Sequence, residues 1–285
     1  MNDLTLYGPY GATQRETAEH VREAGGNAMW FHGFNPEGFA AAESAGISAC
    51  VEFKTFRADF QRRPELVPIG RDGNPIRFGE RIQGVCLSNR DFVAEREAEL
   101  AEGMARFTPT GVWLDYLTYA GWFETPAPDL QESCFCPSCI REFCRAESVD
   151  AESPDVILTR YADRWWGHKC RRIDSHGRRF ADIIRDADQE CAVGVYMCPW
   201  TPEEYDGALS RIFAQDYRLF SEWVDAFTPL IYAEKSGRDP SWSREYMVSA
   251  QRFVPPEVPV LPILDYLDFP ASVEALATSP VPPIG

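Results

Sequence analysis

The stretch Gly111-Val-Trp-Leu-Asp115-Tyr-Leu-Thr-Tyr-Ala-Gly-Trp-Phe-Glu124 decides the fold of this 285-residue chain. It begins as a short apolar run with the composition of a buried strand. A carboxylate, Asp115, stands where this run ends, next to Tyr116. Because a charge inside an apolar strand is costly to bury, we expect the strand to end at Asp115 and the side chain to open onto a site.

The segments on both sides of this strand alternate between strand and helix patterns. We predict further strands over residues 4–10, 27–34, 47–56, 191–200, 226–234 and 259–267. We predict helices over residues 13–24, 36–45, 91–107, 154–190, 217–224, 241–253 and 271–277. Strands that alternate with helices across short connections are typical of parallel βα units, so the sequence predicts an α/β protein with a (β/α)₈ TIM-barrel fold. A doubly wound open sheet is the alternative, but the first predicted strand lacks the glycine-rich phosphate turn of that fold.

The C-terminal end of the predicted barrel is short. Residues 280–285 alone follow the last predicted helix, and three of them are prolines, which donate no ladder hydrogen bonds. We therefore expect the eighth strand to be incomplete or missing. The open sheet edge would then need cover from a partner subunit, as in a homo-oligomer, or from a missing C-terminal region.

No linker divides the chain, so we expect one TIM-barrel domain over residues 1–285. It should carry a proline- and glycine-rich loop insertion over 57–83 and a cysteine-rich zinc loop over 123–153. The formal charge of -16 argues against a nucleic-acid partner, because the chain has too few cations to neutralise phosphates. We find no leader and no apolar run of membrane-spanning length, which favours a cytoplasmic protein without a membrane partner.

Carboxylates recur near the predicted strand ends, which form the active face of a TIM barrel. Glycoside hydrolysis needs one carboxyl group as acid and a second as nucleophile or base. The candidate catalytic residues are Asp115, Asp265, Glu234 and Glu52. Each has a simpler interpretation as a helix cap, a solvated side chain or an ion pair, for example Glu52 with Lys54.

Polar and aromatic side chains at the same strand ends are candidates for substrate binding, since rings stack on sugar faces. They are Tyr7, His32, Lys54, Tyr116, Trp122, Tyr196, Trp200 and Tyr232. A single tryptophan is more often a core residue than a sugar platform, and His32 serves equally well as a hydrogen-bonded lining residue.

The motif Cys134-x-Cys136-x-x-Cys139 brings three potential thiolate ligands together, and a structural zinc site needs four. The spacing leaves the fourth ligand open between Cys86 and Cys144. Buried free thiols are the alternative for the whole cluster. The chain has nine cysteines, an odd number, which suits a reduced compartment with a metal site better than a disulfide framework.

One pattern of this chain resembles the zinc-carrying β-galactosidases of glycoside hydrolase family 42. It consists of a cysteine, a helix, an apolar strand and then Cys-x-Cys-x-x-Cys followed by an aromatic residue. The match covers Cys86 to Phe143. The Gly-Val-x-Leu-Asp-Tyr strand also looks like that of uncharacterised hypothetical glycosyl hydrolases. The resemblance implies a structural zinc held by Cys86, Cys134, Cys136 and Cys139. It also implies a catalytic carboxylate at Asp115, although this chain has Leu114-Asp115 where the β-galactosidases carry Asn-Glu.

We therefore expect a glycoside hydrolase that acts on a carbohydrate substrate through Asp115 and a second carboxylate. The alternative is a TIM barrel that binds carbohydrate, or serves as a scaffold, without catalysis. A catalytic zinc is disfavoured, because catalytic sites usually keep a water ligand and use His or carboxylate ligands.

Overall fold

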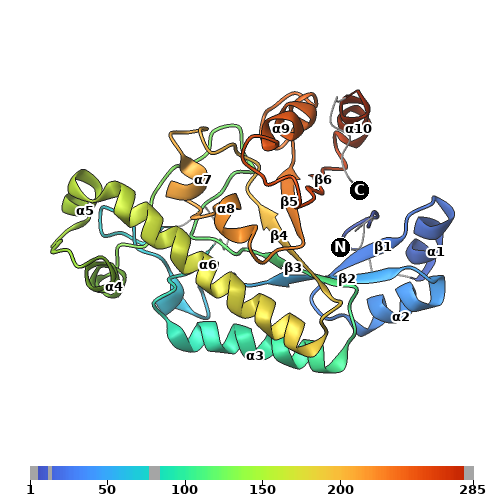
Figure 1. Ribbon diagram of the computed structural model, residues 1–285, viewed down its shortest axis with the longest axis horizontal. Coiled ribbons are helices and arrows are strands. Elements are labelled where there is room, and N and C mark those ends of the chain that lie inside the picture. Colours follow the sequence, from blue (N-terminus) through green and yellow to red (C-terminus); the bar gives the residue numbers. More distant parts are fainter. Residues whose placement is uncertain (1–5, 12–14, 77–83, 279–285) are drawn as a thin grey trace.

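Six parallel strands curve into a half-barrel with helices on the outside in the computed structural model, which describes residues 6–11, 15–76 and 84–278 (Figure 1). Neighbours in the sheet follow the order of the chain. The strands are β1 (Ala28–His32), β2 (Ser48–Lys54), β3 (Gly111–Asp115), β4 (Ala192–Met197), β5 (Ala226–Ile231) and β6 (Ile263–Leu264). This architecture confirms the predicted α/β class as a partial (β/α)₈ barrel.

The helices connect successive strands. They are α1 (Arg15–Glu23), α2 (Pro36–Ala45), α3 (Arg90–Arg106), α4 (Pro137–Glu147), α5 (Pro154–Arg160), α6 (Ala162–Ala187), α7 (Ala208–Arg211), α8 (Tyr217–Phe220), α9 (Trp242–Ala250) and α10 (Phe269–Ala277). Asn35 and Asn89 cap α2 and α3, because each side chain accepts a hydrogen bond from a first-turn N–H. The predicted helix over 154–190 is two helices, α5 and α6, which meet at Tyr161.

The first predicted strand is an irregular extended segment. Residues 6–11 run beside β1, where Trp30 N donates to Pro9 O at 3.1 Å and Gly11 N donates to Trp30 O at 2.8 Å. Pro9 has no N–H to continue the ladder. Gly8 allows the close approach, since a Cβ there would lie 1.8 Å from the carbonyl oxygen of Ala28.

The last strand is shorter than predicted. Within residues 259–267, β6 holds two residues, and Val260 adds an isolated parallel bridge to Phe227. Pro259 and Pro262 donate no hydrogen bonds, which limits regular pairing. Among the described residues no eighth strand joins β6 to the segment 6–11, and residues 279–285 lie outside the description.

Two long loops leave the strand ends. In the predicted insertion over 57–83, Pro64–Leu66 forms one 3₁₀ turn and Ile69 pairs with Pro75 in a small hairpin. Residues 77–83 of this loop lie outside the described part of the chain. The second loop runs from the end of β3 to α4 and carries the cysteine motif. The hairpin and the cysteine loop are hydrogen-bonded to each other, since Phe135 N donates to Ile69 O at 2.8 Å.

Trp113 fills the interior of the barrel. Its indole N–H donates to Thr228 Oγ1 at 2.8 Å, and its ring meets Trp30 edge to face. Gly111 and Gly194 flank the ring, and a Cβ on Gly194 would lie 2.3 Å from the indole nitrogen. The interior therefore has a solid apolar floor below the strand C-termini.

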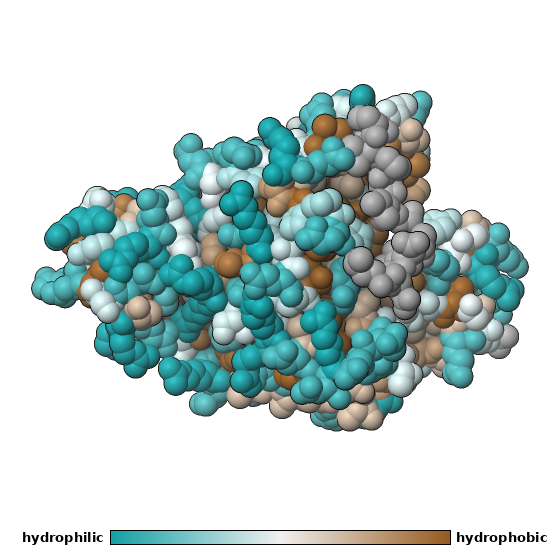
Figure 2. All heavy atoms as spheres, viewed as in Figure 1, coloured by the Kyte–Doolittle hydropathy of each residue, from teal (hydrophilic) through white to brown (hydrophobic). Residues whose placement is uncertain are grey.

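The outer face of the sheet packs against α3 and α6, which lie together over it (Figure 1). Hydrophilic side chains cover much of the visible face of the molecule (Figure 2). Large exposed apolar side chains occur around β6, α9 and α10, and they are Val248, Tyr266, Leu267, Phe269 and Val273. Throughout the described ranges, no helix has both the length and the apolar character needed to cross a membrane.

Replacing Gly194 with alanine should destabilise the fold. The added methyl group overlaps the indole of Trp113, and overpacking of this kind costs about 1–3 kcal/mol. Gly167→Ala is the matched control, because its Cβ would meet only the end of the flexible Arg171 side chain and alanine favours the helix by about 1 kcal/mol. Urea unfolding of both variants measures the difference. Equal stability for Gly194→Ala and the wild type would contradict this account of the floor.

Candidate functional site

A pocket opens at the C-terminal ends of the strands, above Trp113. It holds about 620 Å³ of empty space, part of it open to solvent. Glu52, Asp115 and Tyr196 lie on the interior face of neighbouring strands, because side chains alternate along a strand and the register aligns β2, β3 and β4. The lining residues are Tyr10, Glu52, Asp115, Tyr116, Thr118, Phe123, Glu124, Tyr196, Met197, Cys198, Phe213, Gln215, Leu230, Tyr232 and Ile263.

Glu52 lines this pocket although its side chain is 1% exposed. Two neighbours compensate its charge: His32 Nδ1 lies 3.0 Å and Lys54 Nζ lies 3.2 Å from Glu52 Oε1. The pairing register explains the contact, since His32 stands opposite Glu52 and Lys54 lies two residues further along the same strand face. Burial acts to raise the pKa of Glu52, but the contacts with His32 and Lys54 outweigh it and hold this pKa below its usual value.

Asp115 has the opposite environment. Burial raises the pKa of Asp115 well above its usual value, and the negative charge of Glu52 raises it further. The N–H of Tyr116 donates to Asp115 Oδ1 at 2.8 Å, which only partly offsets this effect. Tyr116 takes a left-handed conformation with φ of 54°, so the chain turns sharply away as soon as the strand delivers Asp115.

The two carboxyl groups of the pocket therefore differ in protonation. One pKa is raised and the other is lowered, so Asp115 holds its proton over a pH range in which Glu52 is ionised. Pairs of titratable groups whose pKa values are pushed apart are typical of acid and base partners in catalysis.

Four tyrosines surround the carboxylates. Tyr10, Tyr196 and Tyr232 have raised pKa values, first because of burial and then because of nearby negative charge, so their hydroxyls stay protonated. The hydroxyl of Tyr196 is buried and has no hydrogen-bond partner among the described residues. Tyr116 completes the set and lies under the guanidinium of Arg57.

Three of the aromatic residues that the sequence suggested lie elsewhere. Tyr7 packs at the N-terminal end of β1, where its carbonyl accepts from the backbone N–H groups of Asn27 and Ala28. Trp200 is 2% exposed and packs against Tyr205 and Phe213. Trp122 is half-buried beside the pocket, with its indole N–H on the carbonyl oxygen of Glu124.

The other two candidate carboxylates are also outside the pocket. Asp265 is buried, with Oδ2 2.6 Å from Lys235 Nζ and Oδ1 accepting from Leu267 N at 3.0 Å. Glu234 is exposed to solvent, and its backbone N–H donates to Asp268. The structure therefore brings together Asp115 and Glu52 of the four predicted catalytic residues.

Glu124 and Tyr10 are pocket residues that the sequence did not single out. Glu124 follows Trp122 in the aromatic run after β3, and its Oε2 lies 3.8 Å from Lys235 Nζ. That run was a usable signal for Glu124. For Tyr10 the signal was its place at the end of the Tyr-Gly-Pro-Tyr run that begins with the candidate Tyr7.

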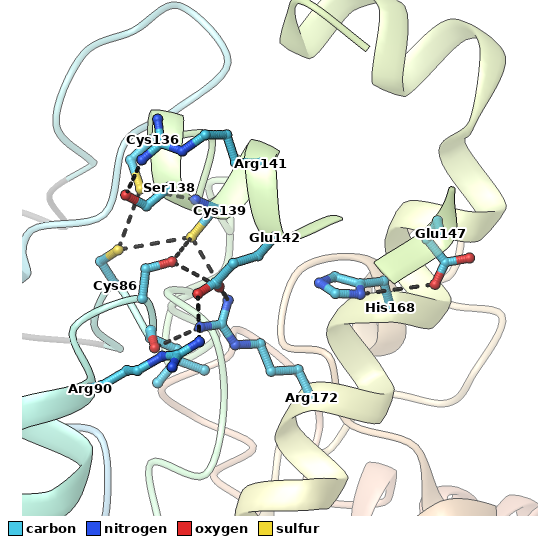
Figure 3. A network of polar contacts seen from close by, with 12 residues as sticks. Cys86, Arg90, Cys136, Ser138, Cys139, Arg141, Glu142, Glu147, His168 and Arg172 are labelled. Atoms are coloured by element: carbon cyan, nitrogen blue, oxygen red, sulfur yellow. Dashed lines mark hydrogen bonds and ion pairs between the residues drawn. The ribbon is translucent and has the colours of Figure 1, made fainter. Parts of the chain in front are cut away.

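A second candidate site lies outside the barrel, where four cysteine sulfurs come within 4.8 Å of one another. Figure 3 shows three of these cysteines, Cys86, Cys136 and Cys139. Cys86 Sγ is 3.6 Å from Cys136 Sγ and 3.9 Å from Cys139 Sγ. Four thiolates around a zinc at about 2.3 Å would lie about 3.8 Å apart, so the donor set and the spacing fit a tetrahedral metal site. Cys134 is the fourth member of this group, which we call the four-cysteine cluster.

Of the two candidates for the fourth ligand, Cys86 is the one whose sulfur joins this group. Cys86 lies just before α3 and within reach of the cysteine motif, whereas Cys144 lies on α4 and its thiol donates to Ala151 O at 3.6 Å. The N–H groups of Ile69 and Cys139 donate to the sulfurs of Cys134 and Cys136. Such backbone donors stabilise negative charge on sulfur.

Comparisons with known proteins agree on the fold. No family model and no curated protein matches the sequence. The catalytic domain of β-amylase from Paenibacillus polymyxa superposes with a TM-score of 0.64 at 10% identity, covering 94% of this chain and 88% of that domain. The PgaB (BpsB) glycoside hydrolase domain from Bordetella bronchiseptica superposes with a TM-score of 0.62 at 12% identity. The match covers 82% of this chain and 73% of that domain.

A GH42 β-galactosidase from G. stearothermophilus gives a TM-score of 0.61 at 9% identity, covering 87% of this chain. This chain spans 43% of that β-galactosidase. The structural neighbours are thus glycoside hydrolases with a TIM-barrel-like fold.

Asp115→Asn should change the pH dependence of stability. Because the folded pKa of Asp115 is raised, its contribution to stability is complete below the unfolded pKa of about 3.9 and is lost as the pH rises through the folded pKa. Asparagine keeps the acceptor for Tyr116 N and cannot ionise. The free energy of unfolding of the variant should therefore increase relative to that of the wild type as the pH rises above about 4, by up to about 1.4 kcal/mol per pH unit.

Urea unfolding between pH 4 and pH 8 measures this difference. Glu234→Gln is the control, since its side chain is exposed and outside the pocket. A constant loss of stability in Asp115→Asn at every pH would mean that Asp115 serves as a structural cap.

Proposed function

We propose that this chain is a glycoside hydrolase in which Asp115 is the general acid and Glu52 is the ionised carboxylate. One observation carries the proposal: two carboxyl groups lie in one pocket at the strand C-termini, and their pKa values are shifted in opposite directions. The fold shared with glycoside hydrolases supports it.

In the proposed reaction Asp115 donates its proton to the glycosidic oxygen as the bond to the anomeric carbon breaks. The sugar ring then carries partial positive charge, and the negative charge of Glu52 stabilises it. Water supplies the hydroxyl that replaces the leaving group, and its proton restores Asp115. His32 and Lys54 keep Glu52 ionised throughout.

A carbohydrate-binding barrel without catalysis is the second candidate. It is favoured by the ion pairs of Glu52, whose Oε1 contacts both His32 and Lys54, and by the pairing of Asp265 with Lys235. Under this alternative, sugars bind in the pocket and no glycoside is cleaved.

A screen of nitrophenyl glycosides and oligosaccharides, read by both turnover and thermal shift, separates the two candidates. On a substrate found in this way, Asp115→Asn should lower kcat/KM by about 10²–10⁴-fold, the usual contribution of general acid catalysis. Wild-type activity should fall as the pH rises through the pKa of Asp115. Glu234→Gln should retain full turnover. Binding without turnover in the wild type, across the whole screen, would favour the non-catalytic barrel.

We expect the Tyr196 hydroxyl to donate a hydrogen bond to the bound sugar, because it is buried in the pocket and has no partner among the described residues. Tyr196→Phe should weaken sugar binding by about threefold to tenfold, the effect of one hydrogen bond, while melting temperature stays level or rises. Tyr246→Phe is the matched control, since its hydroxyl lies 2.5 Å from that of Tyr217 and its removal should lower melting temperature. Unchanged sugar binding in Tyr196→Phe would contradict this role.

We also propose that the four-cysteine cluster holds one structural zinc ion. Four sulfur donors would fill all four coordination positions of a zinc ion, which is typical of a structural site. The zinc would cross-link the loop before α3 to the start of α4. Its resemblance to the cysteine pattern of the GH42 β-galactosidases supports this assignment.

Protein purified without chelator should contain about one zinc per chain by metal analysis. Cys136→Ser should lose the metal and melt at a lower temperature, because metal binding contributes directly to folding free energy. Cys144→Ser should keep the zinc, since its thiol is outside the cluster. Metal-free wild-type protein would refute the site.

A further inference from the structure

The four-cysteine cluster poses an electrostatic problem if it binds zinc. Four thiolates and one divalent cation leave a net charge of about −2. Cys86, Cys134 and Cys139 are buried, so water compensates little of this charge. A buried charge without a partner is strongly destabilising, and a positive group close to the sulfurs would stabilise this charge beyond what the backbone donors Ile69 N and Cys139 N supply.

Arg172 of α6 is in position to supply this positive group (Figure 3). Its side chain is 15% exposed, and Nη1 lies 4.0 Å from Cys139 Sγ. Nη2 donates to the carbonyl oxygen of Leu87 at 2.6 Å, directly beside Cys86. The guanidinium thus contacts both segments that carry the cysteines.

Further contacts fix the orientation of this guanidinium. Glu142 Oε2 lies 2.8 Å from Arg172 Nη1. Ser88 Oγ lies 3.0 Å from Cys139 Sγ and donates to Glu142 Oε2 at 3.1 Å. The acidic Glu142 adds negative charge to the same region, which increases the need for a cation.

Other nearby arginines are turned elsewhere. Arg141 is exposed and donates to Ser138 Oγ, and Arg171 is 58% exposed and pairs with Glu147. Arg90 is 79% exposed, with Nη2 3.9 Å from Glu142 Oε1. Their polar contacts within the described part of the chain are therefore with carboxylate and hydroxyl oxygens.

We propose that Arg172 is the counter-ion of a zinc-thiolate centre and positions its two ligand-bearing segments. This inference depends on the metal site and is independent of the proposed hydrolase activity. In this proposal Arg172 stabilises the negative charge of the centre. An arginine that only joined α6 to Glu142 would have no such electrostatic effect on the metal site.

The test measures zinc affinity of the full chain by competition with a chromogenic chelator. Arg172→Gln should bind zinc about 10–100-fold more weakly, the usual effect of losing an outer-shell partner of a metal ligand. Arg172→Lys, which keeps the charge, should recover part of the affinity. Arg171→Gln should match the wild type.

Glu142→Gln separates the electrostatic role from a structural one. This variant breaks the same ion pair but removes a negative charge, so zinc affinity should stay level or increase. Equal weakening by Glu142→Gln and Arg172→Gln would overturn the proposal, because the ion pair alone would then explain both.

Thermal melts with zinc and with excess EDTA provide a second readout. The loss of melting temperature in Arg172→Gln should be larger with zinc than with EDTA. The same loss under both conditions, or unchanged zinc affinity, would overturn the counter-ion role. A wild-type chain that binds no zinc would overturn both this inference and the metal site, and would leave the hydrolase proposal standing.

Discussion

The close packing of Trp113 against Gly111 and Gly194 is the constraint on which the site depends. The indole occupies the barrel interior at the level of Glu52 in the register, and Asp115 follows two residues later on the same strand face. Apolar side chains fill the interior below this level, and polar ones gather above it. The position of the pocket therefore follows from how the interior is filled. The indole of Trp113 closes the barrel from below, and the alternation of side chains along β3 places the next inward side chain, Asp115, at the end of the strand.

Charge compensation on this floor then sets the chemistry. Glu52 is buried but keeps its negative charge, because His32 and Lys54 approach the same oxygen. Burial raises the pKa of Asp115, and the charge of Glu52 raises it further. The two pKa shifts are parts of one arrangement, because a change at His32 acts on Asp115 through Glu52 and Lys54 acts on both carboxyl groups. Asp265, by contrast, is neutralised by Lys235 and contributes to packing at β6.

Helix α6 connects the barrel with the cysteine loop. Lys169 is fully buried, and its Nζ donates to the carbonyl oxygens of Ser133 and Arg211 and lies over the ring of Tyr119. One turn further along α6, Arg172 reaches the four-cysteine cluster. Burial lowers the pKa of Lys169 to about 8, although Glu132 Oε2, 3.9 Å from its Nζ, acts to raise it. The loop after β3 is thus held on one side by the sheet and on the other by Lys169 of α6, which explains how a long loop forms a stable pocket wall.

The sequence by itself determined the alternation of strands and helices, the placement of Asp115 at a strand end and the cysteine motif, because these follow from local periodicity and spacing. Tertiary structure alone decided which distant groups meet. Glu52 belongs to the pocket and Asp265 does not, since their ion pairs with His32 and Lys235 form between segments whose contacts no local pattern encodes. The spacing along the chain left the fourth cysteine open, and a family resemblance suggested Cys86. In the structure Cys86 joins the cluster across fifty residues because the loop before α3 and the start of α4 are packed together.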